Sequence, residues 1–80
     1  MYINVSLVDM SNTIYVERSL WEKSSDLKSV LDYTAEPWSI DKILVNGSSI
    51  SEKDLSRKLS SFNRTRTILG EYELQIEKHK

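Results

Sequence analysis

Residues 42–51, KILVNGSSIS, constrain the fold of this chain more than any other segment. The apolar run at 43–45 has the length and the β-branched content of a short buried strand. The Asn-Gly pair at 46–47 is a strong signal for a tight turn, because both residue types tolerate positive φ angles. Ser51, with Asp54 three residues later, resembles a capping box and predicts the start of a helix. The segment therefore predicts a strand, a turn and a helix in immediate succession.

Two stretches of alternating apolar residues at the start of the chain predict a β-hairpin. The first covers residues 2–8 and the second covers residues 13–17, with a turn signal at 11–12. Side chains two apart on a strand share a face, so the apolar positions are expected to point to one side of a sheet. These positions are Ile3, Val5, Leu7, Ile14 and Val16.

Two helices are predicted in the middle of the chain. The first is expected at 27–35, after a Ser-Ser-Asp cluster that can supply the N-cap, and it ends before Pro37. Its apolar positions follow helical spacing and are Leu27, Val30, Leu31 and Ala35. The second is a short amphipathic helix with Leu55, Leu59 and Phe62 on its apolar face.

The last strand is predicted at 71–77, where the alternation is the cleanest in the chain. Tyr72, Leu74 and Ile76 are expected to point inward, and the intervening glutamates and Gln75 outward. A polar loop at 63–67 is expected to precede this strand.

The order strand, strand, helix, strand, short helix, strand resembles the β-grasp, or ubiquitin-like, fold. The resemblance is carried by the patterns at 2–17, 27–35, 42–47, 55–59 and 72–76. It implies a single α+β domain over residues 1–80, with a mixed sheet and the main helix packed on one face. The strand ending in Asn-Gly is also similar to one in small uncharacterised proteins of low-GC Gram-positive bacteria. Conjugating and sulfur-carrying members end in Gly-Gly, whereas this chain ends in Glu-Lys-His-Lys, so activation of the C-terminal carboxylate is not expected.

Composition narrows the class of protein further. Eighty residues allow one domain, and the net charge of −1 lacks the basic excess of a typical nucleic-acid binder. The absence of cysteine excludes disulfides and thiolate metal sites. No apolar run approaches the roughly 20 residues that cross a bilayer, and no signal-peptide core is present, so a cytoplasmic location is expected. One alanine and one proline, with abundant Ile, Lys and Ser, fit an AT-rich bacterial or phage genome.

Catalytic chemistry is not indicated by any group of residues. His79 is the sole histidine and is expected in a frayed C-terminal tail, without the partners that orient a catalytic or ligating imidazole. Ser48 and Ser49 follow Gly47 but have no neighbouring base to activate them, so turn and cap roles are expected. The sequence therefore predicts no enzyme, no cofactor and no metal site.

A protein-binding site on the sheet face opposite the helix is the leading functional prediction. Tyr2, Tyr15 and Leu44 would supply exposed apolar surface. Lys42, Glu71, Glu73 and Glu77 would supply the polar rim. Ubiquitin-like domains commonly bind partners through this face, so the resemblance implies the same surface. In the alternative reading, the tyrosines pack on neighbouring strands and the glutamates only keep a solvated face polar. Trp38 either closes the end of the core or stands exposed as an anchor.

Weak anion or nucleic-acid binding is the second prediction, from a different functional class. Arg57, Lys58, Arg64 and Arg66 gather between the short helix and the last strand. Arginine can bind phosphate through two parallel hydrogen bonds. The aromatic residues that single-strand binders place among their basic residues are missing from this segment. A solvated basic loop is the alternative reading.

Overall fold

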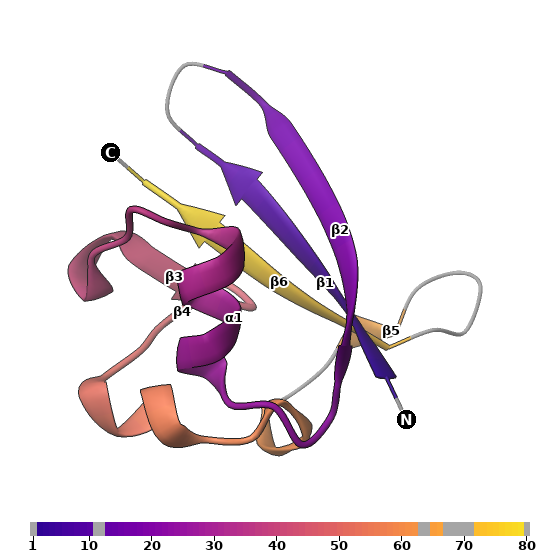
Figure 1. Ribbon diagram of the computed structural model, residues 1–80. Coiled ribbons are helices and arrows are strands. Elements are labelled where there is room, and N and C mark those ends of the chain that lie inside the picture. The colour runs from indigo at the N-terminus through magenta and orange to yellow at the C-terminus, as the bar shows by residue number, and fades with distance from the viewer. Residues whose placement is uncertain (1, 11–12, 63–64, 67–71, 80) are drawn as a thin grey trace.

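A computed structural model describes residues 2–10, 13–62, 65–66 and 72–79 of the chain (Figure 1). Its helical elements are the α-helix α1 (Leu27–Thr34) and the 3-10 turns η1 (Ile40–Lys42), η2 (Glu52–Ser56) and η3 (Leu59–Ser61). Its strands are β1 (Tyr2–Asp9), β2 (Tyr15–Glu22), β3 (Ile43–Val45), β4 (Ser48–Ser49), β5 (Thr65–Arg66) and β6 (Tyr72–Lys78).

The strands form one mixed sheet in the order β2-β1-β6-β3-β4, with β5 paired to the start of β6. The two central strands β1 and β6 run parallel, and all other pairs are antiparallel. The prediction of an α+β fold with a mixed sheet and one main helix is confirmed. The short strands β4 and β5 were not predicted; β5 lies inside the segment expected to be a polar loop.

The hydrophobic core lies between the sheet and α1, which covers one face of the sheet (Figure 1). The sheet contributes Ile3, Val5, Leu7, Ile43, Val45, Leu74 and Ile76, and α1 with its C-cap contributes Leu27, Val30, Leu31 and Ala35. Each of these side chains is at most 6% exposed. The expected inward positions of the first strand, the helix, the third strand and Leu74 and Ile76 are therefore confirmed. Tyr72, at the end of β6, remains 43% exposed.

The second strand departs from the prediction in both extent and facing. It extends five residues further along the chain than expected, ending at Glu22 rather than at residue 17. A two-residue turn at 11–12 would place Val16 opposite Leu7, but the structure places Val16 opposite Val8. This one-residue shift moves every side chain of the strand to the other face. Ile14 and Val16 are consequently 89% and 51% exposed, and the prediction that they point inward is wrong.

Local hydrogen bonds fix the ends of α1 and the turn after β3. The Asp26 carboxylate accepts the backbone N–H of Ser29 at 2.9 Å and caps α1, as the sequence predicts. At the turn, Asn46 and Gly47 have φ angles of 52° and 80°, the left-handed values expected of an Asn-Gly turn. The Asn46 side-chain oxygen also accepts the backbone N–H of Gln75 at 2.9 Å, which ties the turn to β6.

The expected short helix with Leu55, Leu59 and Phe62 is instead two separate 3-10 turns, η2 and η3. Arg57 and Lys58 between them have extended backbone angles, which interrupt the helical hydrogen-bond pattern. Backbone bonds from Leu27 N–H to the Arg57 carbonyl and from Leu59 N–H to the Ser25 carbonyl hold this extended link against the start of α1. The capping box of Ser51 and Asp54 is present as predicted.

Candidate functional site

The face of the sheet opposite α1, here called the open face, is defined by the strand register. Residues directly opposite each other in the ladder share a face, so each row can be followed from strand to strand. The open face carries Tyr2, Asn4, Ser6 and Val8 of β1, Val16, Arg18, Leu20 and Glu22 of β2, Leu44 of β3, Ser49 of β4, and Glu73, Gln75 and Glu77 of β6.

Exposed apolar side chains concentrate on the hairpin formed by β1 and β2. In the described part of the chain, eight large hydrophobic residues are exposed, and six of them lie between residues 2 and 20. These six are Tyr2, Met10, Ile14, Tyr15, Val16 and Leu20. Leu20 and Tyr2 are 67% and 61% exposed on the open face. Clustered apolar exposure of this kind is typical of interaction surfaces.

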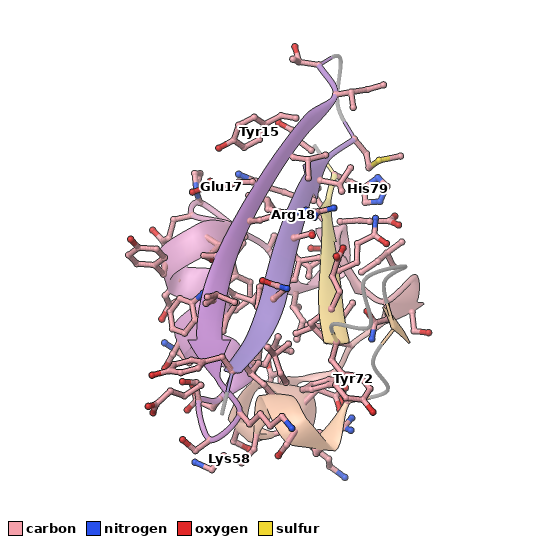
Figure 2. All side chains as sticks on the ribbon, turned by 90° about the vertical axis from the view of Figure 1, so that its right-hand side faces the viewer. Tyr15, Glu17, Arg18, Lys58, Tyr72 and His79 are labelled. Atoms are coloured by element: carbon pink, nitrogen blue, oxygen red, sulfur yellow. The ribbon has the colours of Figure 1, made fainter. Side chains whose placement is uncertain are left out.

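A polar contact separates the two apolar ends of this hairpin on the open face. The buried Ser6 hydroxyl donates to Glu73 at 2.7 Å, and the Arg18 guanidinium lies 3.9 Å from the same carboxylate. Ser6 and Arg18 are directly opposite each other and Glu73 belongs to β6, so the contact joins β2, β1 and β6; Arg18 is labelled in Figure 2. Glu73, expected as a binding residue, is thus already engaged within the sheet.

The other predicted open-face residues fall into different positions. Tyr2 and Leu44 lie on the open face as expected, Leu44 half-buried. Glu77 lies opposite Leu44. Lys42 is in η1, one residue before β3. Glu71 lies outside the described residues.

The expectation that Tyr15 shares the open face with Tyr2 is wrong. Tyr15 is opposite Asp9, which shares a face of β1 with the buried Leu7. Tyr15 therefore lies on the side of the sheet that α1 covers. Its hydroxyl donates to Glu17 at 2.7 Å, and the two labelled side chains lie together near the tip of the hairpin (Figure 2). This hydrogen bond to a carboxylate raises the pKa of Tyr15. The cause is the same register shift that exposes Val16.

Sequence reasoning missed Leu20 and Val16 as open-face residues. Leu20 lies beyond residue 17, where the predicted strand ends, and Val16 is predicted to point into the core. Both strand faces of β2 mix apolar and polar residues, with Val16, Arg18 and Leu20 on one side and Glu17, Ser19 and Trp21 on the other. The alternation signal in this strand is therefore weak. The apolar residues Leu20 and Trp21 beyond residue 17 were the signal that the strand continues.

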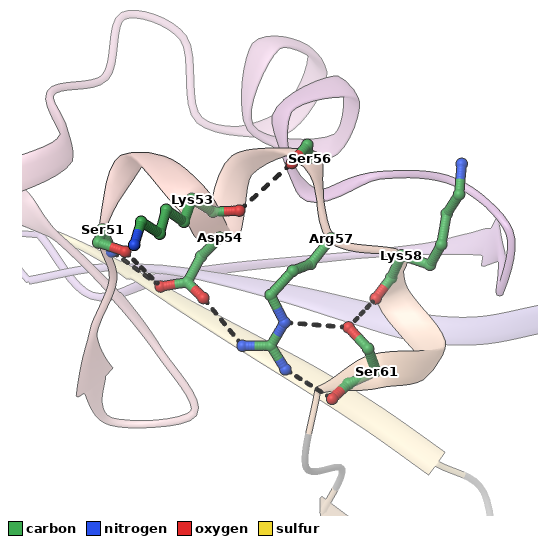
Figure 3. Close-up of polar contacts among 7 residues, drawn as sticks. All are labelled: Ser51, Lys53, Asp54, Ser56, Arg57, Lys58 and Ser61. Atoms are coloured by element: carbon green, nitrogen blue, oxygen red, sulfur yellow. Dashed lines mark hydrogen bonds and ion pairs between the residues drawn. The ribbon is translucent and has the colours of Figure 1, made fainter.

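Within the basic segment proposed as an anion site, Arg57 is occupied by internal contacts (Figure 3). Arg57 donates to the Asp54 carboxylate at 2.9 Å and to the hydroxyl and carbonyl oxygens of Ser61 at 3.1 and 2.6 Å. Its guanidinium carbon also lies 4.1 Å from the centre of the Phe62 ring. The pKa of Asp54 is lowered mainly by the hydrogen bond from the Ser51 backbone N–H and to a smaller extent by the one from Arg57. Arg57 therefore holds η2, η3 and the core edge together.

No described contact joins Lys58 or Arg66, the other described basic residues of that segment, to Arg57. Lys58 is exposed, and its backbone bridges to Asp26 at the start of α1. Arg66 belongs to β5, where it is opposite Tyr72, and Arg64 lies outside the described residues.

His79 is held in place, so the expectation of a frayed tail at this residue is wrong. Its backbone N–H donates to the Lys42 carbonyl at 2.9 Å, which continues the pairing of β6 with β3. Trp38, for which two readings were open, is partly buried against the core, and its indole N–H donates to Asp32 at 2.9 Å.

Membrane-spanning helices and metal-binding clusters are both absent from the described residues. No helix among them combines the length and the apolar character needed to cross a membrane. Within the same residues, His, Asp and Glu side chains form no group of three or more that could hold a metal ion.

Comparison with known proteins adds no relative. No protein-family model matches the chain, and no curated protein or solved structure matches it.

Proposed function

We propose that this protein is a small non-enzymatic interaction module with a β-grasp-like fold, which binds a protein partner through the open face of its sheet. The sheet order supports the fold assignment: a central parallel pair of first and last strands, flanked by a hairpin on one side and by β3 on the other. The α-helix α1 covers one face of the sheet, and the proposed binding surface is the opposite, open face (Figure 1).

The observation that carries the proposal is the concentration of exposed apolar side chains on the β1–β2 hairpin. A sheet face that served only as solvated surface would favour polar side chains at its outward positions. Here Tyr2, Val16 and Leu20 occupy such positions and are each more than half exposed. Their burial against a partner would remove apolar surface from water, which is the main driving force of association.

Charge on the open face indicates the kind of partner. Glu22, Glu73 and Glu77 lie on this face with Arg18, so carboxylates outnumber the basic group. Arg18 and Glu73 already approach each other within the sheet, and the Glu77 carboxylate lies 3.9 Å from Nε2 of His79, which leaves Glu22 to complement a partner. The proposed partner therefore presents apolar side chains accompanied by lysine or arginine, in the manner of a hydrophobic centre with a polar rim.

The test is site-specific photo-crosslinking in cells that produce the protein. A photoreactive residue at Leu20 or Leu44 should capture one common partner, and the same residue at Tyr33 should not. Tyr33 is 74% exposed on α1, behind the sheet, and is a matched aromatic control. Different or absent adducts at Leu20 and Leu44 would contradict the proposal.

Substitutions then measure the contribution of each contact to binding of the captured partner. Leu44→Ala should weaken binding by about 1–2 kcal/mol if Leu44 is a core contact. Leu20→Lys should weaken it by more, because it places a positive charge inside an apolar interface. Tyr33→Lys also replaces an exposed large hydrophobic residue by lysine, but away from the open face, and should leave the affinity unchanged. Calorimetric titration of the purified partner provides the measurement.

A further inference from the structure

A pocket at the C-terminal end of β6 contains an unusual set of side chains. It has a volume of about 380 Å³ and is lined by Pro37, Trp38, Ser39, Lys42, Lys78 and His79. These residues come from the segment after α1, from η1 and from the end of β6, which lie together in Figure 1. The backbone bond from His79 to Lys42 fixes two of the three segments to each other.

The charge of the pocket lining differs from that of the whole chain. Three of its six lining residues are basic and none is acidic, in a protein whose net charge is −1. Among the described residues, the ammonium groups of Lys42 and Lys78 take part in no hydrogen bond or ion pair. Two lysines that form no described ion pair, both in the lining of one pocket, favour an anionic ligand.

Carboxylates near the pocket are already engaged by other groups. Asp41 accepts a short hydrogen bond from the Ser39 hydroxyl, and Asp32 accepts hydrogen bonds from Lys28 and from the Trp38 indole. After the hydrogen bond from Ser39, the charge of Lys42 also contributes to lowering the pKa of Asp41, so this lysine is partly compensated, whereas no carboxylate interaction is described for Lys78.

His79 adds a second, independent observation. Its Nε2 atom is buried and has no hydrogen-bond partner in the described structure, with the nearest carboxylate oxygen, that of Glu77, 3.9 Å away. A buried polar atom without a partner is unfavourable unless a ligand or water satisfies it.

Trp38 and Pro37 provide the apolar part of the lining. The indole ring is partly buried against the core and is oriented by its hydrogen bond to Asp32. A fixed aromatic side chain beside cationic groups suits a ligand with a flat ring attached to its charged group.

We propose that this pocket binds a small aromatic oxyanion, a phosphate or a carboxylate carried on a ring, with Lys42 and Lys78 contacting the charge and Trp38 the ring. This site is separate from the open face and does not depend on the proposed protein partner.

The experiment is an NMR titration of the wild-type protein with phenyl phosphate, followed through the indole N–H of Trp38 and the amide of His79. Benzoate tests the carboxylate form, inorganic phosphate tests charge without a ring, and benzyl alcohol tests the ring without charge. Phenyl phosphate or benzoate should bind at least about tenfold more tightly than either partial ligand. Equal affinity for inorganic phosphate, or no shift with any of the four compounds, would overturn the proposal.

Three lysine variants separate this pocket from general attraction of anions. Lys42→Gln and Lys78→Gln should each weaken binding by about fivefold or more, through loss of a charge-assisted hydrogen bond. Lys53→Gln removes the same charge from the exposed surface of η2 and should have no effect. Equal weakening by all three substitutions would refute a specific pocket. Amide spectra of each variant establish that it is folded.

Discussion

Asn46 has two roles at the turn between β3 and β4. It adopts a positive φ angle of 52°, which asparagine tolerates better than most residues. Its side-chain oxygen also accepts the N–H of Gln75, a partly buried group in the central strand β6. The neighbouring Gly47 has a φ angle of 80°, and an added Cβ there would meet no atom within 4 Å. Only backbone strain therefore opposes a side chain at residue 47.

Substitutions at this turn should reveal the two roles separately. Asn46→Ala is expected to lower the free energy of unfolding by about 1–3 kcal/mol, because it leaves the Gln75 N–H without its acceptor and adds backbone strain. Asn46→Gly keeps the backbone conformation and should destabilise less, and Asn46→Asp keeps the acceptor and should destabilise least. Gly47→Ala should cost about 1 kcal/mol from strain alone. Urea unfolding measures all four; a wild-type value for Asn46→Gly would exclude the role of the side-chain acceptor.

Strand β2 is the element whose facing decides the character of the open face. Its residues alternate between the two sides of the sheet, and the register with β1 determines which set is exposed. Val16 is opposite Val8 and half exposed, whereas Val5, opposite Ser19, is 1% exposed in the core. The two valines are thus a matched pair that differ in environment and not in chemistry.

Threonine substitutions at these valines test the register. Val5→Thr should destabilise the protein by about 1–3 kcal/mol, because the new hydroxyl is buried without an assured partner. Val16→Thr should change stability by about 0.5 kcal/mol or less, since the position faces solvent. Urea unfolding at neutral pH provides both values. Comparable losses for the two variants would mean that Val16 points into the core and that the register is shifted by one residue.

The whole molecule should lose stability in acid, because several aspartates are ionised more readily in the fold than in the unfolded chain. Hydrogen bonds lower the pKa of four of them below the ordinary 3.8: from Ser29 to Asp26, from Lys28 to Asp32, from Ser39 to Asp41, and from the Ser51 backbone to Asp54. A lowered folded-state pKa contributes stability that is present above the unfolded pKa and is lost as the pH falls through the folded value.

The expected result is a urea midpoint that falls as the pH drops below about 4, where unfolded aspartates begin to bind protons. Asp54→Asn removes one of these carboxylates and should reduce the fall over that pH range. Asp54 is the informative choice because its partners Ser51 and Arg57 connect η2 with η3 (Figure 3). A midpoint that does not change between pH 5 and pH 3 would contradict the assignment of these hydrogen bonds.

Much of the architecture could be predicted because strong local signals act within single segments. The Asp26 cap, the helical spacing of Leu27, Val30 and Leu31, and the alternation of Leu74 and Ile76 each specify an element without long-range information. The division of the second helix into η2 and η3 could not be predicted, because it depends on backbone contacts of Arg57 and Leu59 with the start of α1.

The sequence by itself determined that β1, α1, β3 and β6 form and which of their side chains enter the core, since burial follows a short-range period of polar and apolar residues. Tertiary structure decided the facing of β2, the contact of Glu73 with the buried Ser6, and the meeting of Trp38, Lys42 and His79 around one pocket. These features depend on strand register and on contacts between distant segments. One residue of slippage exchanges the two faces of a strand, and no local pattern in β2 was strong enough to exclude it.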